Sequence, residues 1–148
     1  MNEALIIADQ TLILHRHPRR KNETLQAWDS ADEYLINHFD ENELAKYITE
    51  DGQLLIINDG FGALSCYFNE LQRTVVSDSF LSVGSIKLNM QRNHCDPELL
   101  LIQDSLQTLP TNAKVVLIKV PKTLAFLEYQ LQQLSTVIGQ DTIVVAAG

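Results

Sequence analysis

The hydrophobic residues of this chain fall into short aliphatic runs, separated by stretches in which apolar and polar residues follow a helical period. Runs that are apolar almost throughout are typical of strands buried on both faces of a parallel sheet. We therefore predict five such strands, at residues 54–58, 74–77, 99–103, 114–119 and 142–147.

Amphipathic stretches separate most of these strands. We predict helices at residues 62–72, 81–93 and 123–137, and a short helix at 41–50. In the last long helix the leucines form a single stripe, which we interpret as the side that faces the sheet. At the amino terminus the apolar segments 4–8 and 11–15 predict a β-hairpin.

A further helix is expected between Leu25 and Phe39, where apolar residues recur at steps of three and four. Asp29 and Asp32 fall on the opposite, polar face of this helix. Trp28 falls on the apolar side, so we expect it to anchor the core rather than to stack on a nucleic-acid base.

Taken together, these elements predict an α/β fold. The order β-α-β-α-β-β-α-β indicates a Rossmann-like, mostly parallel sheet with helices on both faces, preceded by the β-hairpin and a helix. The length of 148 residues suits one domain over residues 1–148. The chain stops directly after a predicted strand, so we expect it to be part of a longer protein.

The composition is that of an ordinary globular protein, with 45% apolar and 20% charged residues. No apolar run is long enough to span a membrane and no signal peptide precedes the hairpin, so we expect a cytoplasmic protein without a membrane partner. The cysteines and histidines lack metal-ligand spacing, so we expect no metal and two reduced structural thiols. These residues are Cys66, Cys95, His15, His17, His38 and His94.

Positive charge is concentrated in one segment, although the net charge is −8. Residues 15–21 contain Arg16, Arg19, Arg20 and Lys21. A solvated loop is one interpretation of this segment. The other is a patch that contacts phosphates, because clustered cations bind a polyanion even when the whole surface is acidic.

A glycine turn follows the predicted strand at 54–58. The sequence Asn58-Asp59-Gly60-Phe61-Gly62 leads into a predicted helix, which is the layout of a nucleotide-binding βα unit. Two glycines alone are a weak signal. Asp59 would also place a negative charge where an anionic ligand requires backbone amides.

Other strand ends carry candidate ligand-binding side chains. Asp78 follows the second strand at the distance where a carboxylate holds ribose hydroxyls, but it could equally cap the next helix. Lys119 and Lys122 follow the fourth strand, where they could contact a phosphate or simply begin an exposed helix.

Three segments resemble a known family. They are residues 25–35 (LQAWDSADEYL), 58–66 (NDGFGALSC) and 115–125 (VVLIKVPKTLA). They are similar to the amino-terminal region of the RlmG/RsmC family of bacterial rRNA guanine-N2 methyltransferases, and the likeness runs through nearly the whole chain. The resemblance implies a tandem of two class I methyltransferase-like domains. The carboxyl-terminal domain would bind S-adenosylmethionine and carry an Asn-Pro-Pro-Phe catalytic motif, whereas the amino-terminal domain would serve RNA recognition and support its partner.

The residues of this chain depart from the active pattern of the family. Aligned without gaps, Ile56 stands in place of the acid before the glycine loop, Asn58 replaces the first glycine, and only Gly60 and Gly62 remain. Residues 119–122 (KVPK) stand in place of Asn-Pro-Pro-Phe. Lysine only donates hydrogen bonds, so it cannot accept them from a target amine as the asparagine does. We therefore expect no catalytic residue and no bound cofactor in this chain, with Gly60, Gly62 and Asp78 as vestigial positions.

The resulting hypothesis is the amino-terminal part of an S-adenosylmethionine-dependent 23S rRNA guanine-N2 methyltransferase, whose catalytic carboxyl-terminal domain is absent from this chain. The candidate RNA-binding residues are Arg16, Arg19, Arg20, Lys21, Lys119 and Lys122. One alternative is a domain that still binds S-adenosylmethionine itself. The other is a pure scaffold for the catalytic half that makes no RNA contact.

Overall fold

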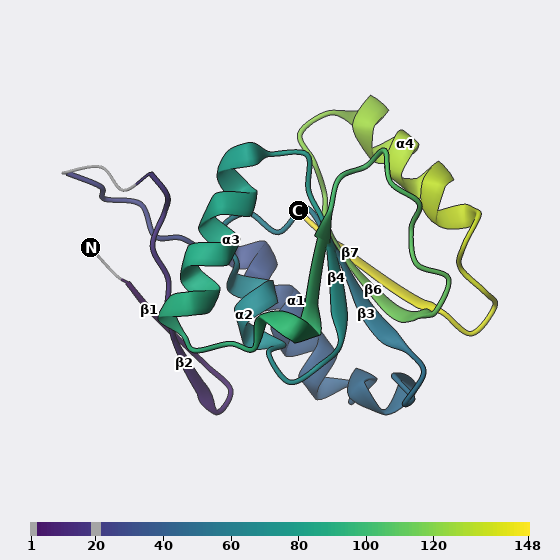
Figure 1. The fold of residues 1–148 in the computed structure, drawn as a ribbon, viewed down its shortest axis with the longest axis horizontal. Helices are drawn as coiled ribbons and strands as arrows, with labels where there is room; N and C mark the ends of the chain where they lie inside the picture. The colour runs from purple at the N-terminus through teal and green to yellow at the C-terminus, as the bar shows by residue number, and fades with distance from the viewer. Residues whose placement is uncertain (1–2, 19–21) are drawn as a thin grey trace.

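The computed structural model describes residues 3–18 and 22–148, and it is built around one parallel sheet. Its five strands lie in the order β5-β4-β3-β6-β7, and every neighbouring pair is parallel (Figure 1). The strands are β3 (Gln53–Ile57), β4 (Arg73–Val76), β5 (Leu100–Gln103), β6 (Ala113–Lys119) and β7 (Ile143–Ala147). The predicted α/β, Rossmann-like fold is confirmed.

Helices cover both faces of this sheet. On one side lie α1 (Ser30–Glu41), α2 (Ala63–Tyr67) and α3 (Phe80–Arg92), and on the other lies α4 (Leu124–Ser135) (Figure 1). Successive side chains of a strand point to opposite faces. Leu54 and Ile56 of β3 therefore join the larger core under α1, α2 and α3, and Leu55 and Ile57 join the smaller one under α4.

The first helix begins later than its apolar pattern predicted. Leu25 is 58% exposed, and α1 starts at Ser30. Asp29 caps it: its side chain accepts from the Asp32 N–H while the Asp32 carboxylate accepts from the Asp29 N–H, at 3.0 Å each. This reciprocal cap fixes the start of the helix. Trp28 is buried in the core, as predicted, although it precedes the helix.

The helix after the glycine turn is shorter than predicted. It ends at Tyr67, not at residue 72. The side chain of Asn69 donates to the carbonyl of Cys66 at 2.9 Å, and so satisfies a group that the end of the helix leaves free. The chain then turns into β4 at Arg73. Two short 3₁₀ segments, η1 (Leu44–Tyr47) and η2 (Pro97–Leu99), complete the connections.

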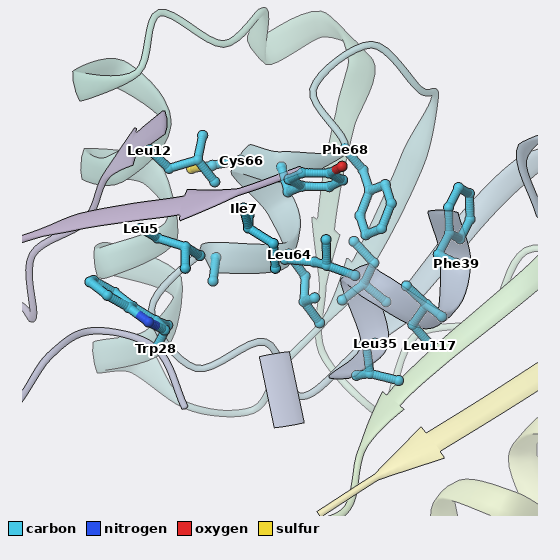
Figure 2. Packing of buried hydrophobic residues seen from close by; sticks show 14 of the residues in the cluster. Leu5, Ile7, Leu12, Trp28, Leu35, Phe39, Leu64, Cys66, Phe68 and Leu117 are labelled. Atoms are coloured by element: carbon cyan, nitrogen blue, oxygen red, sulfur yellow. The ribbon is translucent and has the colours of Figure 1, made fainter. Parts of the chain in front are cut away.

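The predicted hairpin forms an outer layer over α2 and α3. Its strands β1 (Ala4–Ile7) and β2 (Gln10–Ile13) are antiparallel, with Leu5 opposite Leu12. Figure 2 shows their buried side chains beside α2, with Leu12 next to Cys66. Each such leucine contributes roughly 1.5–3 kcal/mol by leaving water.

Among the helices of the described residues, none has the length and apolar character that a membrane crossing requires.

Candidate functional site

The strand order reverses between β3 and β6, because β4 and β5 follow on one side of β3 and β6 and β7 lie on the other. In an open α/β sheet the ligand crevice lies at such a point, beyond the carboxyl ends of the two strands. Residues 58–62 enter the crevice from β3, and Lys119 ends β6. The two come close: a Cβ on Gly60 would lie 3.7 Å from the Lys119 Nζ.

Asp59 occupies the position that an anionic ligand would use. Its side chain is 1% exposed and accepts from the Gly62 N–H at 3.2 Å. It also accepts from the N–H and the hydroxyl of Ser65, at 2.9 and 2.6 Å. The free amides at the start of a helix attract anions. In this chain its own carboxylate takes those at the start of α2.

A pair of side-chain amides closes the crevice between β3, β6 and α4. Asn58 donates to the Lys119 carbonyl at 2.9 Å and to the Gln130 side-chain carbonyl at 3.0 Å. Gln130 donates back to the Asn58 side-chain oxygen at 2.9 Å. Asn58 has a φ of 69°, a left-handed conformation that asparagine tolerates better than most residues.

The ammonium of Lys119 fills the middle of the crevice. It lies 3.0 Å from the Asp32 carboxylate and 3.2 Å from that of Asp29, both contributed by the start of α1. Burial lowers the pKa of Lys119, but the charges of Asp32, Asp59 and Asp29 outweigh it and hold the pKa above its usual value. Lys119, which the sequence made a candidate for contacting a phosphate, is therefore paired with carboxylates of the same chain. An RNA contact of Lys119 stays a prediction.

Asp32 is the most perturbed carboxyl of this group. It is 2% exposed, although its place in the helical pattern predicted a solvent-facing residue. Burial raises the pKa of Asp32 to about 7; Lys119 opposes this, and the charges of Asp59 and Asp29 add to it. Sequence reasoning missed this residue, because nothing local in residues 25–39 indicates that a lysine 87 positions away covers it.

Asp78 does not cap α3, which corrects one of its two interpretations. The N-cap is Ser79, whose hydroxyl accepts from the Ser82 N–H. The Asp78 carboxylate instead accepts from the N–H and the hydroxyl of Ser105, at 2.7 and 2.6 Å, and so joins the ends of β4 and β5. An open hollow of about 540 Å³ lies beside it, with Phe80 and Leu106 among its lining residues.

The two glycines of the turn have different roles. Gly62 has a φ of +103°, and a Cβ there would lie 3.2 Å from the Ile86 Cα of α3. A side chain would therefore strain both the turn and its packing. Among the described residues, a Cβ on Gly60 would have only the Lys119 ammonium within 4 Å. Packing against α3 thus accounts for Gly62 without a ligand.

The described part of the basic segment, residues 15–18, contacts the glycine turn through Arg16. Arg19, Arg20 and Lys21 fall outside the described residues. The guanidinium of Arg16 lies 4.7 Å from the centre of the Phe61 ring and donates to the Gln26 carbonyl at 3.0 Å.

Arg16 also lines a hollow of about 180 Å³ together with His15, His17, Leu88 and Arg92. Arg92, in the last turn of α3, was missed in the sequence because it lies far from the basic segment along the chain. Lys122, the remaining candidate, is exposed in the loop before α4. No group of metal-binding side chains occurs among the described residues.

Comparison with known proteins identifies relatives over the whole chain. Residues 2–148 match the family model described as the RLMG N-terminal domain. The chain is 70% identical, over 148 residues, to ribosomal RNA large subunit methyltransferase G of Psychromonas ingrahamii. The aligned region covers 100% of this chain and 39% of that protein. It is 47% identical to the protein of the same name from Photobacterium profundum, over 99% of the chain and 38% of the relative. The chain thus spans about two fifths of the length of these relatives.

Solved structures share the fold at low identity. A tRNA (uracil-54, C5)-methyltransferase of Pyrococcus abyssi, in complex with S-adenosyl-L-homocysteine, superposes with a TM-score of 0.59 at 10% identity, over 98% of this chain and 34% of that one. The methyltransferase subunit of a type I restriction-modification system from Streptococcus thermophilus superposes with a TM-score of 0.59 at 12% identity, over 80% of this chain and 34% of that one. These likenesses concern the fold alone.

Proposed function

The chain belongs to the RLMG N-terminal domain family, and from that membership we propose that it is the amino-terminal domain of an S-adenosylmethionine-dependent methyltransferase of large-subunit ribosomal RNA. The full-length protein would transfer a methyl group to the exocyclic N2 of a guanine in 23S rRNA. The part beyond this chain would bind the methyl donor and carry the catalytic residues. A protein that modifies ribosomal RNA works where ribosomes are assembled, so we place it in the cytoplasm.

We further propose that the domain described here does not bind the methyl donor. The observation that carries this proposal is the occupied crevice at the ends of β3 and β6. Asp59 takes the amides of α2, and Lys119 with Asp29 and Asp32 fills the space over Gly60. A ligand would have to separate buried charges from their partners, which costs several kcal/mol. No catalytic residue is assigned to this chain.

Titration calorimetry tests this proposal. S-adenosylhomocysteine added to the 148-residue chain should give no binding heat up to about 1 mM. The full-length protein should bind one equivalent, and Asp78→Ala should leave that stoichiometry unchanged. A second equivalent that disappears in Asp78→Ala would contradict the proposal.

The hollow beside Asp78 favours the alternative function. Its volume of about 540 Å³ could hold a nucleoside, and a carboxylate lies at the position suited to ribose hydroxyls. Against it, both Asp78 oxygens already accept hydrogen bonds from Ser105. The same titration decides between the two, because binding through this hollow would appear in the isolated chain.

For the role of the domain in the full-length protein we propose RNA recognition through the basic segment. Support comes from the hollow in which Arg16 and Arg92 meet two histidines, because it is cationic and of a size to hold a phosphate group. The contacts would be made by Arg16 and Arg92 together with Arg19, Arg20 and Lys21. Lys122 is a separate candidate in the loop before α4.

Salt-dependent RNA binding by the full-length protein tests this role. Replacing Arg19, Arg20 and Lys21 with Gln should weaken binding to 23S rRNA fragments and reduce the slope of log K against log salt by roughly 0.7–0.9 per lost phosphate contact. Lys46→Gln, an exposed cation of η1, is the matched control and should change neither quantity. An unchanged affinity and slope in the triple variant would leave the domain as a scaffold for the catalytic half.

A further inference from the structure

Arg73 is a fully buried cation without a carboxylate partner. It begins β4, and its side chain is 0% exposed. Its Nε and Nη1 donate to the carbonyls of Ser65 and Leu71, each at 2.9 Å, but its Nη2 has no hydrogen-bond partner. None of the ion pairs found among the described residues involves it. Burying an uncompensated charge is costly, so a counter-charge is expected near this guanidinium.

Two cysteines lie near this guanidinium, whose Nε donates to the carbonyl of Ser65, the residue before Cys66. Burial lowers the pKa of Arg73, and the groups that oppose this are first Cys95, then Cys66, and only then Asp59 and Asp96. The two cysteines are in contact, because the Cys95 Sγ lies 3.9 Å from the Cys66 carbonyl. The guanidinium and the two sulfur atoms therefore form one cluster between α2, β4 and the turn after α3.

The two thiols differ in access. Cys66 is fully buried in α2, whereas Cys95 is partly exposed and lines a groove of about 450 Å³. The walls of that groove are mainly apolar, with Met90, Leu100 and Ile102 among them, and Lys87 adds a cation. A small reagent can reach Cys95 from solvent.

We propose that Cys95, in the cluster with Cys66 and Arg73, reacts as a thiolate with hydroperoxides, and that Cys66 resolves the product as a disulfide. Neither thiol is assigned this role by membership of the family, and the proposal does not depend on the role of the domain in RNA methylation. Thiolates beside a cation are the reactive form of cysteine.

The reaction has two balanced steps. The Cys95 sulfur attacks one oxygen of the hydroperoxide: an S–O bond forms, the O–O bond breaks, and the other oxygen leaves as an alcohol, or as water from hydrogen peroxide, after taking up a proton. Cys95 is thereby oxidised to a sulfenic acid and the peroxide is reduced. The Cys66 sulfur then attacks the Cys95 sulfur, an S–S bond forms, and the hydroxyl group leaves as water with the Cys66 proton.

The electrostatics of the pair agree with this order of events. A hydrogen bond from Cys66 lowers the pKa of Cys95 to about 7; burial opposes this shift, and Arg73 adds to it. The pKa of Cys66 is raised, first by its hydrogen bond with Cys95, then by burial and by the charges of Cys95 and Asp59. Once Cys95 is a neutral sulfenic acid its charge no longer opposes ionisation of Cys66, while Arg73 still favours it.

Alkylation by iodoacetamide across pH tests the thiolate in the wild-type chain. At pH ~6 the native Cys95 should react about fivefold faster than Cys95 in the urea-unfolded chain, because its larger thiolate fraction outweighs the lower nucleophilicity of a more acidic thiol. Arg73→Gln should reduce this advantage without removing it, because Arg73 adds to a shift that begins with the Cys66 hydrogen bond, and Arg73→Lys should retain more of it. A native rate at or below the unfolded rate, or a faster reaction of Cys66, would overturn the proposal even if the Arg73 variants fail to fold.

Oxidation by hydrogen peroxide tests the resolving step. The wild-type chain should lose both free thiols and about 2 Da of mass, and dithiothreitol should restore both. Cys66→Ala should instead give a sulfenic acid on Cys95 that dimedone traps, and Cys95→Ala should leave Cys66 unreacted. If the wild type accumulated only a dimedone adduct, or retained both thiols, the disulfide would be excluded.

Discussion

Lys119 and Arg73 are two buried cations that the same fold treats in opposite ways. Lys119 ends β6 with two carboxylates of α1 at ion-pair distance, and its pKa lies above the usual value. Arg73 begins β4 with two backbone carbonyls and no carboxylate at that distance, and its pKa lies below the usual value. One lies at the carboxyl end of the sheet and the other at the amino end.

The presence or absence of a carboxylate partner distinguishes a buried cation that is structural from one that can support chemistry. A cation that is paired with carboxylates of its own chain has little capacity left for a ligand, and Lys119 is paired in this way at the carboxyl ends of β3 and β6. A buried cation that lacks a carboxylate stabilises whatever negative charge can form beside it, and here that group is a thiol. We therefore propose that Lys119 keeps one crevice closed to ligands and that Arg73 supports a reactive thiol pair.

Lys119→Met should have the largest effect on stability. It leaves Asp32 buried with Asp29 and Asp59 nearby and no cation among them, and breaking a buried pair in this way costs about 3 kcal/mol. The urea midpoint at neutral pH measures the loss. Lys122→Met, three residues further on and exposed, is the control and should stay within about 0.5 kcal/mol of the wild type. Similar small losses in both variants would show that the crevice is not held by Lys119.

Arg73→Met should cost less than Lys119→Met. Two backbone carbonyls lose their donors, but a buried cation that has no carboxylate at ion-pair distance is also removed, so we expect a net loss of about 1–2 kcal/mol. Urea unfolding in the presence of a reductant measures it, with the exposed Arg92→Met as control. A loss larger than that of Lys119→Met would indicate a stronger native partner for Arg73 than a thiol.

The contrast between the two cations was only partly visible in the sequence. The apolar runs predicted every strand of the sheet, because strands that are buried on both faces are apolar at nearly every position. They also placed the residues after β3 and β6 at one edge of the sheet. What failed was the polar face of α1: Asp32 has the spacing of an exposed residue, and its burial depends on Lys119, far along the chain.

The thiol cluster shows the same limit. Cys66 and Cys95 were expected to be structural thiols, because no short motif joins them. Their contact depends on α3 packing against α2, and the charge beside them comes from the first residue of β4. Spacing along a sequence reports local periodicity. It does not report which charges meet across a core.

The pH dependence of stability provides a third test of the paired cation. Burial raises the folded-state pKa of Asp32 to about 7, above the 3.8 expected when unfolded, so the folded state binds this proton more tightly. The contribution of Asp32 is therefore complete below about pH 4 and declines as the pH rises to about 7, with a slope of up to about 1.4 kcal/mol per pH unit. Asp32→Asn should flatten the profile over this range in urea titrations. A wild-type profile that rises over the same range would contradict the raised pKa.

Gly60→Ala should have the smallest effect, and it tests whether the space beside Lys119 is a ligand site. A Cβ there would lie 3.7 Å from the Lys119 Nζ, an ordinary contact, and the backbone of Gly60 is not in the left-handed region. Alanine also restricts the unfolded chain, so stability should stay within about 1 kcal/mol of the wild type, on the favourable side. Methyl transfer by the full-length protein should be unchanged, since we expect no ligand to approach the backbone of Gly60. A loss of activity at unchanged stability would mean that the crevice opens to a ligand despite the ion pairs of Lys119.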